Sequence, residues 1–268
     1  EHTVGSRYRL IRMSRVTVES LSGLTPIDTL PSPEELGKKS CDKCKRNRMY
    51  FCYDCRVPMD GVPTPTVTLP CRLDVVKHKK EKNSKSTAIH AKIVAPSQTR
   101  VFDAPDAEDL EDYGSGEGED GWTVLVFPSE NATSIEEFTA TKGKIARFVV
   151  IDCTWFQVGV MTRLPQLKNL PCVSLRAYST AFWRPQHNHD DSHLATIEAI
   201  YYAMREYQEL GLKKAYKGEF DDLLFWFFVT MGKVDAMKEM KEERRKRQLE
   251  EGGKEEEQGE KKERSTAE

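Results

Sequence analysis

Apolar residues gather in four short runs whose composition predicts β-strands. The clearest, at 147–151, contains the consecutive residues Phe-Val-Val-Ile, a pattern typical of a strand that is buried on both faces. Runs at 67–76, 122–127 and 173–175 predict three more strands, the first with a break or an edge at Pro70. The sequence therefore predicts a sheet in which the strand at 147–151 is buried.

Segments between and after these strands carry helical patterns. Residues 133–142 predict a short helix that Thr133 or Ser134 can cap, with acidic residues in its first turn. Apolar residues at helical spacing predict an amphipathic helix at 193–209, and 221–231 reads as a buried closing helix. Alternation of strands and helices predicts an α/β layer fold with a largely parallel sheet.

Three segments lack the apolar residues that a core needs. Residues 1–40 predict an irregular lead-in, and the acidic, glycine-rich stretch 103–121 predicts a mobile, disordered insertion. The tail, 232–268, holds 11 basic and 12 acidic residues, which is typical of either a solvated single helix or disorder. Its basic run at 244–247 resembles a nuclear import signal and favours a nuclear location. No window offers about 20 consecutive apolar residues, so we expect no membrane-spanning helix.

Charge is distributed unevenly along the chain. Residues 36–100 carry 15 Lys and Arg against 5 Asp and Glu, whereas 101–121 carry 9 acidic residues and no basic one. A segment this basic is a candidate surface for nucleic acid. The alternative is an ordinary solvated surface, which charge alone does not exclude.

Four cysteines form the pattern Cys-x2-Cys-x7-Cys-x2-Cys, at Cys41, Cys44, Cys52 and Cys55. Two residues between paired cysteines let both sulfur atoms face one ion, and two such pairs complete a tetrahedral zinc site. Disulfides, an iron–sulfur site or unmetallated thiols are the alternatives. We therefore predict a structural zinc-knuckle module at 41–66.

Basic residues lie among these cysteines, as in a module that contacts phosphate. Those expected to bind RNA in the module are Lys45, Arg46 and Arg48.

Polar and reactive residues follow the buried strand at once, as Asp152-Cys153-Thr154-Trp155. In open α/β sheets, ligands bind at the carboxyl ends of strands. Asp152 is a candidate base or substrate orienter, although capping of the next turn would also explain it. Thr154 is a candidate cofactor contact or a local structural residue. Trp155 is a candidate to stack on a base, with a core position as the alternative.

An ordered set of short pieces resembles motifs of the DTW-domain family, whose members transfer an aminocarboxypropyl group to tRNA uridine. The pieces are the cysteine pairs; His78 and Glu81 before Ser86-Thr87; Phe127-Pro128-Ser129-Glu130; Asp152-Cys153-Thr154-Trp155; Ser179 with Arg184; and Ala195-Thr196-Ile197-Glu198-Ala199. The resemblance covers roughly residues 41–230 and is strongest to the animal members. It departs at Cys153, where many members have Gly.

This resemblance implies a SPOUT-like catalytic domain at 67–231, with a C-terminal trefoil knot and S-adenosylmethionine bound by three loops at strand ends. It also implies attack by N3 of a uridine, in the D-loop of tRNA, on the γ-carbon of the methionyl moiety, releasing methylthioadenosine. Asp152, Thr154 and Trp155 would be catalytic. The implied cofactor contacts are Phe127, Pro128, Ser129, Glu130, Asp152, Thr196, Ile197 and Glu198, although capping alone would explain Glu198.

The further residues expected to bind RNA are His78, Lys79, Lys80 and Arg184, the last with a surface salt bridge as its alternative. We expect the protein to be a monomer. Two other functions fit the residues less fully: a zinc-knuckle RNA-binding adaptor with an inactive α/β domain, and an RNA methyltransferase.

Overall fold

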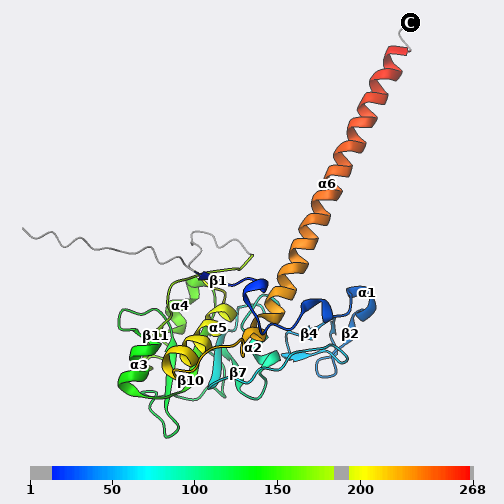
Figure 1. The fold of residues 1–268 in the computed structure, drawn as a ribbon. Helices are drawn as coiled ribbons and strands as arrows, with labels where there is room; N and C mark the ends of the chain where they lie inside the picture. Colours follow the sequence, from blue (N-terminus) through cyan, green and yellow to red (C-terminus); the bar gives the residue numbers. More distant parts are fainter. Residues whose placement is uncertain (1–13, 184–192, 266–268) are drawn as a thin grey trace, which may run out of the picture. The chain divides into compact units, whose positions relative to one another are not determined.

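The apolar runs of the sequence form one parallel sheet in the structure, a computed structural model that describes residues 14–183 and 193–265 (Figure 1). The six strands lie in the order β7-β6-β10-β8-β11-β9. Their bounds are Arg72–His78 (β6), Thr99–Ala104 (β7), Trp122–Val126 (β8), Thr133–Ser134 (β9), Ile145–Asp152 (β10) and Cys172–Ser174 (β11). The predicted α/β class and parallel sheet are thus confirmed.

Strand β10 is buried on both faces, as its apolar run predicts. Phe148 packs edge-on against Tyr207, with ring centroids 5.7 Å apart, on one face. Val149 belongs to a core cluster on the other face, together with Val76 and Leu125 of the neighbouring strands. Because neighbours pair with β10 along both edges as well, a continuous apolar run is what this position requires.

Three of the sheet's strands differ from the sequence prediction. β9 was not predicted, because its two residues, Thr133 and Ser134, fall in the segment predicted as a helix. β6 begins two residues after Pro70 rather than at 67, because proline has no N–H to give to a strand ladder. β7 was not predicted, since charged residues interrupt its apolar positions and it lies at the edge of the sheet.

Helices cover the sheet and join its strands. α3 and α5 pack beside each other, and α5 also contacts α2 and β10 (Figure 1). Their bounds are Ile89–Val94 (α2), Ile135–Lys142 (α3), Trp155–Met161 (α4) and Thr196–Glu206 (α5), followed by a π-helical turn, η3, at Tyr207–Gly211. The predicted helices at 133–142 and 193–209 are confirmed, and Ser134 is the cap of the first. α2 and α4 are too short to give a readable periodicity.

The N-terminal part of the chain contains only short elements. They are β1 (Ser14–Arg15), η1 (Val18–Ser20), η2 (Ile27–Thr29), α1 (Pro33–Leu36), β2 (Lys39–Ser40), β3 (Asn47–Arg48), β4 (Phe51–Cys52) and β5 (Val57–Pro58). β1 pairs with β12 (Tyr178–Ser179), and β2–β3 and β4–β5 form two small antiparallel pairs. Thr25 binds Asp222 through both its N–H and its hydroxyl group, so the described part of the lead-in is anchored.

The acidic stretch 103–121 is packed against the sheet, which corrects the prediction of a disordered insertion. Leu110 is buried in the core cluster that includes Val149. The Tyr113 hydroxyl donates to the buried carboxylate of Asp74 at 2.7 Å, and Arg100 binds the same carboxylate through two nitrogen atoms. One leucine and one tyrosine among many acidic residues are enough to anchor the segment, although they barely change its composition.

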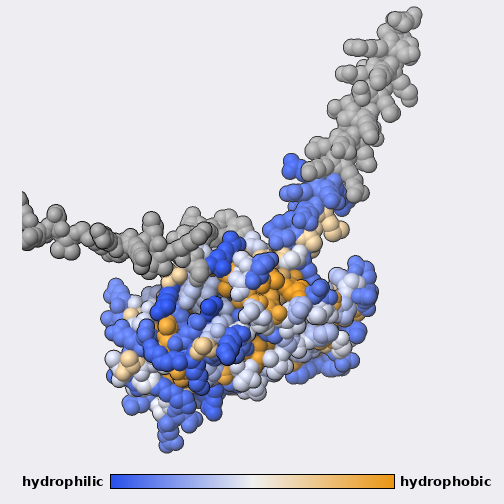
Figure 2. Space-filling view, viewed as in Figure 1, coloured by the Kyte–Doolittle hydropathy of each residue, from blue (hydrophilic) through white to orange (hydrophobic). Residues whose placement is uncertain are grey.

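The predicted closing helix begins as η4 (Asp221–Leu224) and continues as α6 (Phe225–Ser265). The chain divides into two compact units, the first ending at Phe227 and the second comprising Phe228–Glu268. Of the two alternatives for the tail, the single helix is the one observed, and its described side chains beyond residue 235 are exposed. Within the part of the chain that the structure describes, no helix is both long and apolar enough to cross a bilayer. Figure 2 shows hydrophilic residues over much of the visible surface, with hydrophobic residues between them.

Candidate functional site

Most of the predicted catalytic and cofactor-binding residues lie where adjacent strands of the sheet reach their carboxyl ends, in the region of β6, β10 and β8. All pairs in this sheet are parallel, so these ends share one edge. The strand order reverses here, because β6 and β7 lie on one side of β10 whereas β8 and β11 lie on the other. Ligand sites in open α/β sheets lie at such reversals of strand order.

Asp152 is the last residue of β10, and its side chain is only 4% exposed. Its Oδ2 accepts a hydrogen bond from the Ser86 hydroxyl, and its Oδ1 accepts one from the Thr196 hydroxyl, both at 2.6 Å. The Thr87 hydroxyl in turn accepts a hydrogen bond from the N–H of Ile197 at 3.3 Å. Three of the motif pieces, at 86–87, 152 and 196–197, therefore meet at one buried carboxylate.

The pKa of Asp152 is raised because burial disfavours the charged carboxylate. The two hydroxyl donors oppose this rise, and so do the positive charges of Lys77 and Arg56. Lys77 is the register partner of Asp152 on β6 and is 2% exposed. It forms an ion pair with Asp103 at 2.8 Å and donates to the Glu81 carbonyl at 2.9 Å.

Lys77 is a part of this site that sequence reasoning missed as an individual residue. It stands in a run of basic residues that reads as surface, yet the strand alternation turns it inward beside Asp152. The signal available in the sequence was its position, since Lys77 directly follows the apolar residues of β6.

Thr154 and Trp155 begin the helix that follows β10. Thr154 is the N-cap of α4, and its N–H donates to the Gln157 side chain at 3.1 Å, so its local structural role is observed. Trp155 is 44% exposed and meets the edge of the His193 ring at a centroid distance of 4.8 Å. The alternative that placed Trp155 in the core is therefore wrong.

The loop after β8 carries Phe127, Pro128, Ser129 and Glu130 beside the end of β10. Phe127 packs against the core cluster, and its carbonyl accepts the N–H of Ser129 at 2.9 Å in a tight turn. Pro128 and Glu130 are exposed, and no described side chain pairs with the Glu130 carboxylate. Glu130 is therefore available to bind a cationic ligand.

Glu198 is fully buried in the first turn of α5. Its carboxylate accepts hydrogen bonds from the Thr180 hydroxyl at 2.5 Å, the Ala181 N–H at 2.6 Å and the Ala195 N–H at 2.8 Å. Burial raises the pKa of Glu198, and these three donors oppose that rise. The capping alternative is the one observed, because the hydrogen bonds that the Glu198 carboxylate accepts hold residues 180–181 at the start of α5.

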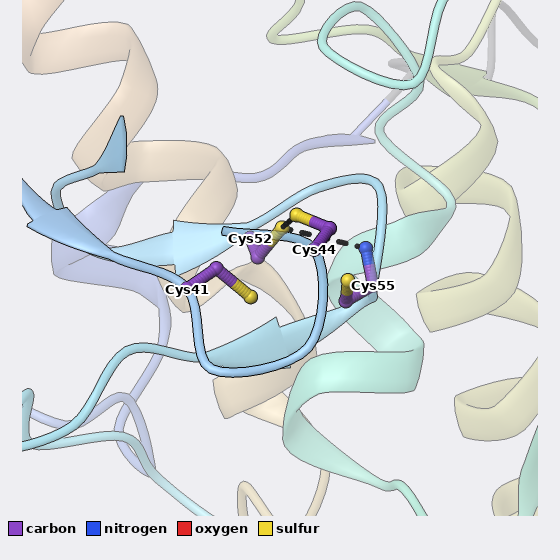
Figure 3. A group of neighbouring side chains, drawn as sticks. All are labelled: Cys41, Cys44, Cys52 and Cys55. Carbon is purple, nitrogen blue, oxygen red and sulfur yellow. Dashed lines mark hydrogen bonds between the residues drawn. The ribbon is translucent and has the colours of Figure 1, made fainter. Parts of the chain in front are cut away.

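The four cysteines of the knuckle pattern converge, and their side chains point toward one another (Figure 3). All four sulfur atoms lie within 4.8 Å of one another, and those of Cys44 and Cys52 are 3.6 Å apart. Zn–S bonds of about 2.3 Å in a tetrahedron separate the sulfur atoms by roughly 3.8 Å. No disulfide joins any of the four in this structure, which disfavours the disulfide alternative.

The two cysteine pairs have the same backbone turn. Lys45 and Arg56, which follow the second cysteine of each pair, have φ angles of 61° and 57°. Their N–H groups donate to the carbonyls of Cys41 and Cys52 at 2.8 and 2.7 Å. These matched turns bring both cysteines of each pair to one side, so the site fits a tetrahedral metal ion.

Some of the residues expected to bind RNA are exposed, whereas others are engaged in contacts with neighbouring side chains. Lys45, Arg46 and Lys80 are exposed, although Arg46 pairs with Asp54 at 2.9 Å. Arg48 is largely covered, pairs with Asp54 at 2.6 Å and stacks over Tyr53. Lys79 pairs with Asp106 at 2.6 Å.

His78 is buried, and its pKa is lowered by burial and by three neighbouring lysines. Its Nδ1 accepts the Lys80 N–H at 3.2 Å. Arg48 and His78 thus have structural roles here that differ from the predicted phosphate contacts, because each is committed to its own neighbours. Arg184 lies outside the described residues.

A cavity of about 610 Å³ lies at the opposite edge of the sheet, where the strands begin. Arg72, Lys144, Arg147 and the acidic stretch at 111–121 line it. It includes none of the residues expected to bind cofactor or RNA.

Comparisons with known proteins find one domain family and several relatives that share one name. Residues 49–234 match the family model described as the DTW domain. The tRNA-uridine aminocarboxypropyltransferase 1 of Mus musculus is 32% identical over 243 residues, which cover 75% of this chain and 78% of that protein. The protein of the same name from Xenopus laevis is 35% identical over 230 residues, with coverages of 72% and 79%. The human one is 30% identical over 243 residues, with coverages of 75% and 78%.

Among solved structures, the SAM-dependent rRNA:acp-transferase Tsr3 from Vulcanisaeta distributa is similar to this chain with a TM-score of 0.36 and 17% identity. The match covers 58% of this chain and 71% of that one.

The substitution Asp152→Asn tests the raised pKa of this carboxylate. An acid whose pKa is higher in the folded state than in the unfolded state stabilises the fold most fully below its unfolded pKa, about 4. This contribution is lost as pH rises through the folded pKa. We therefore expect the free energy of unfolding of the wild type, minus that of Asp152→Asn, to decrease from pH 4 upward in urea titrations. A difference that is flat or that increases with pH contradicts the assignment.

Proposed function

This chain belongs to the DTW-domain family, and on that premise we propose that it is a tRNA-uridine aminocarboxypropyltransferase. The reaction joins N3 of a uridine to the γ-carbon of the methionyl moiety of S-adenosylmethionine and releases methylthioadenosine. The observation that carries the proposal is the match of most of the chain to relatives of that name. The convergence of three motif pieces on Asp152 supports it independently.

S-adenosylmethionine supplies an electrophilic carbon activated by its sulfonium group, so the protein's task is to present the γ-carbon rather than the methyl carbon. That choice is one of position, because attack requires the reacting atoms to be aligned and close. We assign the loops that leave β8 and β10, and the start of α5, to holding the donor. Glu130 has the charge to bind its ammonium group, and Ser129 is the polar neighbour.

Asp152 is best assigned to orientation. Its two oxygen atoms already accept hydrogen bonds from Ser86 and Thr196, so the carboxylate holds two hydroxyl groups in defined directions at the strand edge. With its hydrogen committed to Asp152, the Thr196 hydroxyl presents its oxygen as an acceptor, which suits either a ligand ammonium group or the N3–H of uracil. Thr154 and Trp155, at the start of α4, complete the proposed catalytic group, with Trp155 offering a ring face to a base.

Incubation with labelled S-adenosylmethionine and unmodified tRNA tests this function. We expect methylthioadenosine and labelled tRNA. Release of S-adenosylhomocysteine would instead indicate a methyltransferase, and tRNA binding without either product would indicate an adaptor. Thr196→Val removes the hydroxyl at nearly constant volume, and we expect it to lower the transfer rate about 10-fold or more. Thr141→Val is the matched control, because that hydroxyl bonds only to its own helix, α3.

We also propose that the four converging cysteines hold a structural zinc ion. All four ligands come from the protein, so the site leaves no open position for catalysis. The ion would stabilise the short elements β2–β5, which have few apolar residues of their own. The exposed basic residues Lys45 and Arg46 then stand on a rigid module, where they can contact tRNA phosphates.

Elemental analysis of the purified protein tests the metal. We expect about one zinc per chain, reduced to a small fraction by Cys52→Ser. Cys172→Ser is the control, since Cys172 lies in β11, outside the cluster. Equal zinc contents in the two variants would contradict the proposal.

The SPOUT-like trefoil knot remains part of the proposal. The segment 176–181 is the part of the chain where we propose to look for the knot. It runs beside α5, and hydrogen bonds to Glu206 and Glu198 hold it there. A tRNA D-loop uridine is the proposed acceptor, following the family resemblance.

We propose a nuclear location from the basic run at 244–247 in α6. A fluorescent fusion is expected to concentrate in the nucleus, and replacement of the four residues by Ala is expected to disperse it. Identical distributions of the two fusions would contradict this role for the run.

A further inference from the structure

The helix that follows Asp152 has an exposed aromatic and apolar face. Phe156 is 98% exposed, and Val160, one turn later, is 52% exposed. Trp155 and Gly159 complete this face, because positions separated by four residues stack along a helix. We call these four residues the α4 face. So much exposed apolar surface on a short helix is unusual for a protein surface and typical of a binding site.

A cation lies beside the α4 face. The Arg163 guanidinium reaches back over Gly159, where a nitrogen atom lies 3.6 Å from the position that a Cβ on Gly159 would occupy. No described carboxylate pairs with Arg163. A side chain larger than hydrogen at position 159 would narrow the space between this guanidinium and the helix. The α4 face therefore offers the exposed ring of Phe156 beside a positive charge.

This combination fits an unpaired stretch of RNA better than an apolar peptide. Aromatic side chains stack on unpaired bases, and guanidinium groups bind phosphates and stack on bases. Apolar side chains of a docked peptide would not pair with the cation beside Gly159.

The loop that follows β6 carries further exposed lysines. Lys80 and Lys82 are exposed there, in the segment that also supplies Ser86. Basic residues therefore belong to the segments that follow two adjacent strands, β6 and β10, as binding of a polyanion at the site would require.

We propose that the α4 face is the RNA-positioning surface of the enzyme. Phe156 stacks on an unpaired nucleotide that neighbours the target uridine, and Arg163 binds an adjacent phosphate. The proposal rests on the proposed function and adds to it the surface that receives the tRNA. Phe156 is a positioning residue, because it does not belong to the catalytic group assigned above.

Affinity for unmodified tRNA transcript, measured by fluorescence anisotropy, tests the proposal through a series of variants. Loss of one base–aromatic stack corresponds to roughly 5- to 150-fold weaker binding. We expect Phe156→Ala and Phe156→Leu to weaken binding within that range, and Phe156→Tyr and Phe156→Trp to retain it. Leu keeps the apolar bulk without the ring face, so wild-type affinity in Phe156→Leu would overturn stacking in favour of apolar docking.

The control is Val18→Ala, at another exposed apolar residue of the first unit, and we expect it to bind tRNA as the wild type does. Affinity for S-adenosylmethionine, measured by calorimetry, should be equal in wild type and Phe156→Ala. A parallel loss of S-adenosylmethionine affinity, or unchanged tRNA affinity in Phe156→Ala, would overturn the proposal.

Different results would contradict the proposed activity and the proposed stacking surface. If the wild type transfers no group but the aromatic series still governs tRNA affinity, the proposed activity fails and the stacking surface stands. If the wild type releases methylthioadenosine and Phe156→Ala binds tRNA normally, the activity stands and the stacking surface is wrong.

Discussion

The rest of the site depends on one buried carboxylate and the two hydroxyl groups that it accepts. Asp152 ends β10, which has a paired strand along each edge, and its partners come from segments 66 residues before it and 44 residues after it. An unpaired carboxylate in this position would cost several kcal/mol, because burial removes its hydration. The hydrogen bonds from Ser86 and Thr196 offset that cost only when all three segments are in place. The same interaction therefore defines both the fold at this edge and the geometry available to a ligand.

Charge inside the molecule is organised around this carboxylate. Lys77 and Arg56 share the acidic partner Asp103, and both oppose the rise in the pKa of Asp152. Burial alone would raise the pKa of Asp103, but hydrogen bonds from these two cations lower it. Arg56 directly follows the last cysteine of the knuckle pattern, and it also donates to the Val101 carbonyl of β7 at 3.0 Å. The cysteine module is thereby connected to the sheet, and its position affects the electrostatic environment of the site.

The carboxyl ends and the amino ends of the parallel strands have different roles. At the carboxyl edge, polar side chains meet at Asp152, and the exposed α4 face begins within four residues of it. At the opposite edge, the buried Asp74 receives Arg100 and Tyr113 and anchors the acidic stretch. The acidic residues Asp103 and Asp106 pair with Lys77 and Lys79. The basic surface is therefore limited to the other lysines of this segment. Sequence counts of charge therefore overstate the surface that is free to bind a polyanion.

The sequence by itself determined the α/β class, the buried strand predicted at 147–151, the helices predicted at 133–142 and 193–209 and the cysteine pattern, because each rests on local periodicity or spacing. Only the tertiary structure decided which of the chemistry-bearing residues are accessible. Glu198, His78 and Arg48 are occupied by neighbours that the sequence does not place beside them, whereas Trp155 and Phe156 are exposed although their apolar character favours burial. The acidic stretch likewise folds through contacts of Leu110 and Tyr113 with distant strands. Hydrogen-bond partners and burial arise from contacts between residues far apart in the chain, and a local pattern contains no information about them.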